Sequence, residues 1–159
     1  MTEEGHLEVS NDSKPFDFVG QTRRGKVLLV GEGHLSFALA LASRPNSNAK
    51  NILATTFEKA NSLSDMTIRN GRALVGRGGS ISHGIDATKL HANIELRGFQ
   101  LIAFQFPNTG TRESVHQRTA NHYLVRRFLR SAVGLIARQG KISISLVDSA
   151  HHNGAFDIE

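Results

Sequence analysis

The chain has 159 residues, of which 39% are hydrophobic and 21% are charged, and its formal net charge is +5. This composition is that of one ordinary globular domain and excludes a disordered chain. The chain contains no cysteine, which excludes a disulfide framework, a cysteine-ligated zinc site and a catalytic thiol. It shows no secretory signal and no apolar run long enough to span a membrane, so we expect a cytoplasmic protein without membrane contact. The positive charge favours anionic partners such as nucleic acid.

The order of elements predicts the fold class. Residues 1–24 show no sustained periodicity and are expected to form a leader on the surface, with residues 25–159 as a single domain. The expected strands are residues 27–30, 51–57, 80–85, 99–106 and 141–147. The expected helices are residues 35–42, 59–74, 88–94 and 113–138, and Gly140 would cap the last of them. This alternation predicts a Rossmann-like α/β fold, with a mostly parallel sheet of about five strands and helices on both faces.

A glycine turn, Gly31-Glu32-Gly33, stands between the first expected strand and the first expected helix. Glycines let the backbone turn tightly and let a ligand approach it, and the helix N-terminus offers free N–H groups. Gly31 and Gly33 could be turn residues only, and Ser36 stands where a dinucleotide fingerprint has its third glycine. The strand–turn–helix context favours a turn that holds a nucleoside-type cofactor. A branched side chain at Gly33 is expected to occupy the ligand's space and to strain the turn.

Two acidic residues follow the next two expected strands. Glu58 comes after the second strand, where an acid accepts hydrogen bonds from ribose hydroxyls, although it could instead favour the start of the following helix. Asp86 comes after the third strand, where it could accept from an adenine amino group or cap the next helix. Ala87, beside Asp86, is included in the expected cofactor site.

A third group of candidates ends the fourth expected strand. Gln105 and Asn108 flank a rigid Phe106-Pro107 pair at the edge of the sheet where a substrate would meet the cofactor. Side-chain amides read the edges of planar groups and do not ionise. We therefore place Gln105 and Asn108 as catalytic residues, Gln105 also at the cofactor, and Phe106, Pro107 and Asn108 at the substrate. The alternative is an ordinary strand-ending turn with Pro107 as the stop.

The last expected helix carries Arg118, His122, Arg126 and Arg130 at successive i, i+4 spacings. Such a basic stripe either contacts phosphates or is a solvated face. The histidines lack the spacing of a helical zinc site, so no metal is expected.

Three motifs, in consistent order, resemble the Rossmann-like domain of the eukaryotic 25S ribosomal RNA uridine-N3 methyltransferases. They are residues 30–38 (VGEGHLSFA), residues 84–90 (GIDATKL) and residues 99–110, which contain Phe106-Pro107. The resemblance covers about residues 26–147.

The resemblance implies a class I methyltransferase-like fold that binds S-adenosylmethionine. Gly31 and Gly33 would then pack against its methionine part, Glu58 would take the ribose and Asp86 the adenine. The family's third motif has Asn and His where this chain has Gln105 and Asn108. The resemblance implies a chain truncated after its fifth strand relative to full class I methyltransferases, so we expect a partner, a homodimer most simply, to cover the sheet edge, unless residues 151–159 fold back over it.

The function expected from these observations is a methyltransferase that acts on RNA or a small metabolite. One alternative is an enzyme that cleaves S-adenosylmethionine by cyclisation or elimination and yields methylthioadenosine. Another is a non-catalytic module that binds RNA or a protein partner.

Overall fold

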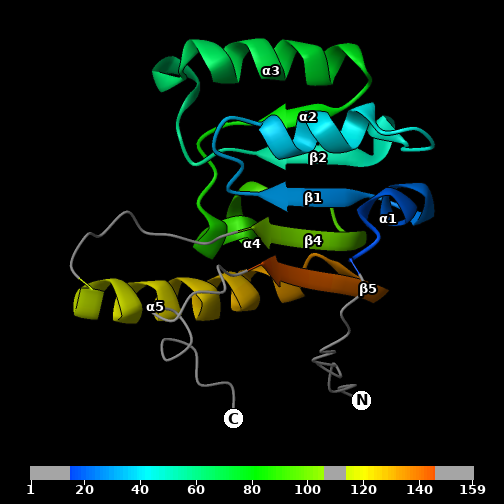
Figure 1. Ribbon diagram of the computed structural model, residues 1–159. Coiled ribbons are helices and arrows are strands. Elements are labelled where there is room, and N and C mark those ends of the chain that lie inside the picture. Colours follow the sequence, from blue (N-terminus) through cyan, green and yellow to red (C-terminus); the bar gives the residue numbers. More distant parts are fainter. Residues whose placement is uncertain (1–14, 106–113, 146–159) are drawn as a thin grey trace.

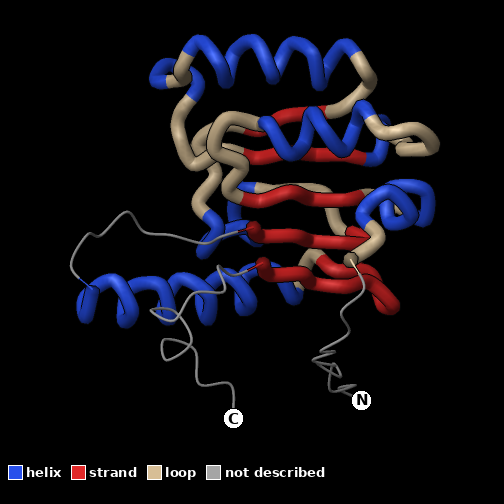
Figure 2. The backbone as a smooth tube through the Cα atoms, in the orientation of Figure 1, coloured by secondary structure: helices blue, strands red, loops and turns tan. Residues whose placement is uncertain are grey.

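The computed structural model describes residues 15–105 and 114–145, and it contains one parallel sheet. The five strands follow the order β3-β2-β1-β4-β5, and each pairs with its neighbours in parallel (Figures 1 and 2). Their bounds are β1 (Val27–Val30), β2 (Ile52–Thr55), β3 (Ser80–Ser82), β4 (Phe99–Gln105) and β5 (Ile136–Ser145). The predicted Rossmann-like α/β fold is confirmed.

Helices cover both faces of this sheet. The α-helices are α1 (Phe18–Arg24), α2 (Ser36–Ser43), α3 (Asp65–Gly76), α4 (Leu90–Asn93) and α5 (Ser114–Val133). Short 3-10 helices are η1 (Ala49–Asn51), η2 (Ala60–Ser62) and η3 (Ala87–Lys89). Among the described residues, no helix is long and apolar enough to cross a bilayer.

The central strand β1 explains why two layers of helices are needed. All four of its residues are buried, and successive side chains point to opposite faces of the sheet. Val27 and Leu29 pack with α2 and α3, whereas Leu28 and Val30 pack with η3, α4 and α5. A strand that is apolar on both sides is typical of a parallel sheet covered on both faces.

The C-terminal helix and strand differ from the prediction. Helix α5 ends at Val133 before Gly134, and β5 already begins at Ile136, so the expected helix end near residue 138 is wrong. Gly140 is a strand residue and not a helix cap. A Cβ there would lie 2.6 Å from the carbonyl oxygen of Phe99, beside the register shift between β4 and β5, and this close approach explains the glycine.

The expected helix over residues 59–74 is divided in two. η2 ends at Ser62, and α3 begins only at Asp65, because the Ser64 side chain accepts a hydrogen bond from the Thr67 N–H as an N-cap. The predicted third strand is also shorter, ending at Ser82.

Part of the expected leader forms helix α1, which the sequence did not predict. Its Phe18 and Val19 side chains pack against the core, and Gln21 and Thr22 are buried. The Asn51 side chain donates to the Thr22 carbonyl at 2.7 Å. These contacts attach residues 18–24 to the sheet, and the boundary at residue 25 stays a prediction.

We expect Phe128→Ala to lower the free energy of unfolding by about 3–5 kcal/mol, because it leaves a cavity in the α5 face of the core. Phe128 is fully buried, and its ring lies edge-on to Phe104 with the centroids 5.0 Å apart. Urea unfolding measures the change, with Val133→Ala on the same helix as control, since Val133 is exposed and should cost less than about 0.5 kcal/mol. Equal effects of the two substitutions would contradict this packing.

Candidate functional site

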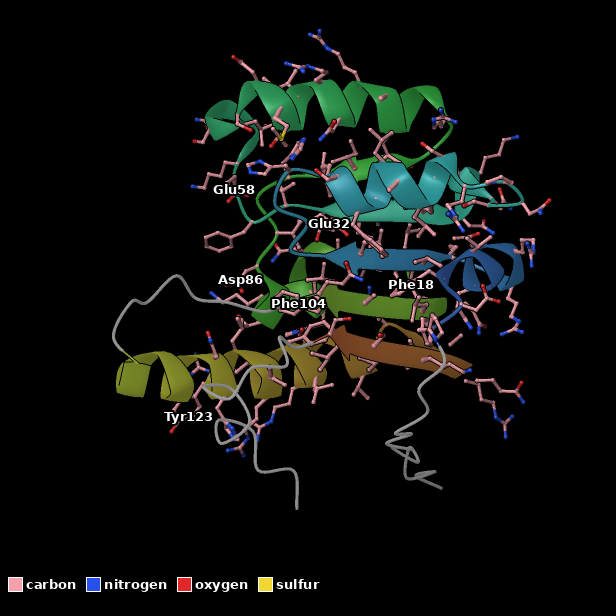
Figure 3. All side chains as sticks on the ribbon, in the orientation of Figure 1. Phe18, Glu32, Glu58, Asp86, Phe104 and Tyr123 are labelled. Atoms are coloured by element: carbon pink, nitrogen blue, oxygen red, sulfur yellow. The ribbon has the colours of Figure 1, made fainter. Side chains whose placement is uncertain are left out.

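The candidate site lies where the strand order reverses, between β1 and β4. The chain crosses from β1 outward to β2 and β3 on one side, and to β4 and β5 on the other. In open α/β sheets the crevice outside the carboxyl ends of the strands at this point is where ligands bind. Glu32, Glu58 and Asp86 all lie at that end of the sheet (Figure 3).

The two glycines of the turn have different structural roles. Gly31 has a φ of +65°, and a Cβ there would lie 2.8 Å from Cε1 of Phe104. Gly33 has no such φ, and a Cβ there would meet nothing within 4 Å. The expectation that a side chain at Gly33 would strain the turn is therefore wrong. A side chain would strain the backbone at Gly31 instead. The space beside Gly33 is open.

Hydrogen bonds from β2 and α3 hold the turn in place. The Glu32 N–H donates to the Thr55 carbonyl at 2.8 Å, and Asn70 Nδ2 of α3 donates to the His34 carbonyl at 2.8 Å. His34 Nδ1 also lies 3.4 Å from Thr67 Oγ1. The backbone around Gly33 is thus positioned before any ligand arrives.

The Glu32 carboxyl lies at the N-terminus of α2. The N-cap residue Leu35 has a φ of 63° and supplies no side-chain cap, and the Ala38 N–H in the first turn favours the charged form of the Glu32 carboxyl. Glu32 is only 8% exposed. Burial raises the pKa of its carboxyl to about 7, and the Ala38 N–H opposes that rise.

The loop after β2 carries Glu58. Its carbonyl accepts from Thr56 Oγ1 and from the Gly84 N–H, both at 2.8 Å, and its side chain is exposed at the carboxyl edge. Because α3 begins at Asp65 with Ser64 as its cap, Glu58 does not serve the start of that helix. The neighbouring Phe57 is 69% exposed.

His83 fixes the same loop from the end of β3. Thr56 has one hydroxyl proton, which it donates to the Glu58 carbonyl, so it must accept from His83 Nδ1, 2.8 Å away. His83 therefore carries a proton on Nδ1. The sequence analysis missed both Phe57 and His83, although an aromatic residue beside a strand-ending acid was a usable signal.

Asp86 caps η3, which is one of the two roles expected for it from the sequence. Its Oδ1 accepts from the backbone N–H and the hydroxyl of Thr88, at 2.9 and 2.7 Å. Burial raises the pKa of Asp86, but the Thr88 hydrogen bonds and the charges of Lys89 and Arg127 outweigh it, so the pKa is lowered overall. Ala87 is buried beside it, and its carbonyl accepts from Ser131 Oγ of α5 at 2.6 Å.

The expected substrate residues are only partly covered. Gln105 is the last residue of β4 and is half-buried beside the β1 turn, since Val30 pairs with Phe104. Phe106, Pro107 and Asn108 lie outside the described residues. Within residues 15–105 and 114–145, no three acidic or histidine side chains gather as a metal site would require.

Residues 28–159 match the BMT5-like family, described as rRNA (uridine-N3-)-methyltransferase BTM5-like. The chain belongs to this family. The resemblance found in the sequence motifs is confirmed.

Named relatives add to this finding. The chain is 31% identical over 125 residues to human Ferredoxin-fold anticodon-binding domain-containing protein 1, an alignment covering 76% of this chain and 19% of that protein. It is 35% identical over 130 residues to an uncharacterised Arabidopsis thaliana protein, covering 76% and 62%. It is 32% identical over 136 residues to Heavy metal-associated isoprenylated plant protein 41 of the same plant, covering 76% and 25%. The chain thus spans between about a fifth and three-fifths of these proteins.

Solved structures support the fold alone. The TM-score is 0.53 with TrmN from Thermus thermophilus, at 17% identity, covering 86% of this chain and 39% of that one. It is 0.52 with a short-chain dehydrogenase from Oenococcus oeni, at 13% identity, covering 80% and 64%. Both are similar to this BMT5-like chain in architecture.

We expect the two glycines of the turn to respond differently to alanine. Gly31→Ala should lower the free energy of unfolding by about 2 kcal/mol or more, because it forces a left-handed backbone on alanine and a contact with Phe104. Gly33→Ala should change it by less than about 0.5 kcal/mol, since the Cβ enters open space. Thermal and urea unfolding of both variants measure the difference, and equal losses would contradict the turn geometry.

A second prediction concerns the Glu32 carboxyl. Its pKa is about 7 when folded and near 4.5 when unfolded, so the unfolded chain releases its proton first as pH rises. The free energy of unfolding should therefore fall between about pH 4.5 and pH 7, by about 3 kcal/mol from this group. Glu32→Gln keeps an acceptor for the Ala38 N–H but cannot ionise, and should remove this fall. Urea unfolding at pH 5 and pH 7.5 tests it, and parallel pH profiles of the two proteins would contradict it.

Proposed function

We propose that this chain binds S-adenosylmethionine at the carboxyl ends of β1, β2 and β3 and transfers its methyl group to an RNA base. The observation that carries the proposal is the space at Gly33, held open beside the N-terminus of α2 in a chain of an rRNA methyltransferase family. The family description supports RNA as the acceptor.

The residues around the space fit the parts of this cofactor. The Gly31–Gly33 backbone would face the methionine part, which needs close approach without a Cβ in the way. The exposed Glu58 carboxylate would accept from both ribose hydroxyls, on a backbone fixed by Thr56 and Gly84. Phe57, next to Glu58, offers an apolar ring for the nucleoside.

Asp86 can combine its two expected roles. Oδ1 receives both Thr88 hydrogen bonds, which leaves Oδ2 to accept from an adenine amino group. The lowered pKa of Asp86 keeps it an acceptor at neutral pH. Ala87, buried beside it, would limit the space for the base.

The cofactor supplies an electrophilic methyl group when bound. The protein's part is to bind, orient and exclude water, since methyl transfer to an atom with a lone pair is accelerated chiefly by proximity and desolvation. Gln105 ends β4 beside the turn, where its amide can donate to and accept from the edge of a planar base. We assign the same role to Asn108, with Phe106 and Pro107 shaping the acceptor side. A homodimer and a cytoplasmic location stay predictions from the sequence.

The test combines binding with product analysis. Titration calorimetry should show S-adenosylmethionine binding to the chain, lost in Gly33→Val and at least tenfold weaker in Glu58→Ala, because charge-assisted bonds to the ribose contribute about 1.5–3 kcal/mol each. Glu95→Gln removes an exposed carboxylate before β4 and should bind as the parent does. Unfolding measurements on each variant separate binding from folding.

Mass analysis after incubation with S-adenosylmethionine and RNA should then show S-adenosylhomocysteine and methylated RNA. Methylthioadenosine would instead identify the cyclase or lyase alternative, and methylation of a metabolite fraction in place of RNA would identify a small acceptor. Binding without any product would leave a non-catalytic module. Unchanged affinity in a folded Gly33→Val protein would overturn the site.

A further inference from the structure

Helix α5 carries a surface charge that packing does not explain. Residues 114–133 contain no aspartate or glutamate, and Arg126, Arg127 and Arg130 are all exposed. Arg126 and Arg130 are four residues apart, a spacing at which like charges slightly destabilise a helix. A solvated helix face ordinarily mixes charges of both signs. Such a one-sign surface is suited to a polyanion.

An aromatic ring stands in the same surface. Tyr123 is 52% exposed, although the core side of α5 is already filled by Phe128 and Ala132. The Arg127 guanidinium carbon lies 5.8 Å from the centre of the Tyr123 ring. An exposed aromatic ring beside an arginine is the combination on which unpaired bases stack.

This surface is continuous with the proposed cofactor site. Ser131 of α5 binds the Ala87 carbonyl, and the charges of Arg127 and Lys89 both act on Asp86. Figure 1 shows that the N-terminal half of α5 extends beyond the carboxyl ends of the strands, and Figure 3 places Tyr123 on its outer side. A strand bound along α5 would thus reach the edge of the sheet that carries Asp86.

Helix α3 also exposes arginines, but it lacks two features of α5: the absence of acidic residues and an exposed aromatic ring. α3 exposes Arg69 and Arg72 but also carries Asp65, and its exposed apolar residues, Met66 and Val75 among them, are not aromatic. It packs on the opposite face of the sheet from α5. The two helices therefore form a matched pair for an experiment.

We propose that Tyr123, Arg126, Arg127 and Arg130 of α5, with Lys89 of η3, form a surface that binds single-stranded RNA beside the cofactor site. The arginines and the lysine contact phosphates, and Tyr123 stacks on a base. A single strand is required because the bases of a duplex are not free to stack on a side chain. The inference rests on the proposed function for its choice of RNA, but its readout is RNA affinity and needs no catalysis.

The experiment measures binding of a fluorescent 12-nucleotide oligouridine by anisotropy at several salt concentrations. Arg126→Gln/Arg130→Gln should lower the affinity at least tenfold, and should reduce the slope of log affinity against log salt by about 1.4, since each lost phosphate contact on a single strand contributes about 0.7. Arg69→Gln/Arg72→Gln on α3 removes the same charge and should leave the slope nearly unchanged.

Tyr123 is tested with a matched pair of its own. Tyr123→Leu should weaken binding about fivefold or more by removing the stacking ring, with the salt slope unchanged, whereas Tyr123→Phe keeps the ring and should bind as the parent does. A duplex of the same length should lose little affinity in Tyr123→Leu.

Several outcomes would overturn the surface. They are no oligouridine binding by the parent, equal losses in the α3 and α5 double variants, or a Tyr123→Leu protein that binds as the parent does. Calorimetry of S-adenosylmethionine binding on the same variants keeps the two proposals apart. If the α5 variants lose RNA binding but still bind S-adenosylmethionine, the surface is supported. If the parent binds no S-adenosylmethionine but the variants change RNA affinity as expected, only the proposed function is overturned.

Discussion

The constraint on which the site depends is the way the chain leaves strand β1. β1 is buried on both faces between β2 and β4, and the chain must turn sharply where it leaves the sheet to enter α2. Phe104 of the neighbouring strand leaves no space for a Cβ at Gly31, and a φ of +65° would strain one. The turn then directs Glu32 toward α2 and leaves the backbone at Gly33 open. The contact between Gly31 and Phe104 thus links the packing of the core to the shape of the candidate site.

The parts of this arrangement that could be predicted from the sequence are those encoded locally. The apolar run over residues 27–30 predicts β1 with the bounds that the structure has, and the glycines after it predict the turn. Helix α1 was missed because its seven residues show no periodicity, although Asp17 caps it locally by accepting from the Gly20 N–H. Its contacts with Asn51 and the core could not be predicted in this way. Gly140 looked like a helix cap because only the pairing of β5 with Phe99 reveals its role in the strand.

Burial and neighbouring charges decide the chemistry of the carboxyl groups at the edge of the sheet. Glu32 and Asp86 are both carboxylates after strand ends, yet their pKa values move in opposite directions. Glu32 is buried, and only the Ala38 N–H opposes the resulting rise of its pKa, so burial dominates. Asp86 receives two hydrogen bonds from Thr88 and lies near Lys89 and Arg127, so its charged form is favoured. The Thr88 cap of Asp86 follows from spacing along the chain, whereas the burial of Glu32 and the approach of Arg127 to Asp86 do not.

The fold by itself does not distinguish between chemistries, since the two similar solved structures are proteins as different as TrmN and a short-chain dehydrogenase. What separates them must lie in the residues that line the crevice. Here an open glycine, an acid with an exposed side chain after β2 and a capping aspartate after β3 stand in the order expected for a nucleoside ligand. Because η3 also binds α5 through Ser131, the element that would contact adenine is packed against the helix that would contact RNA. On the proposed function, the packing of η3 against α5 would bring cofactor and acceptor to one edge of the sheet.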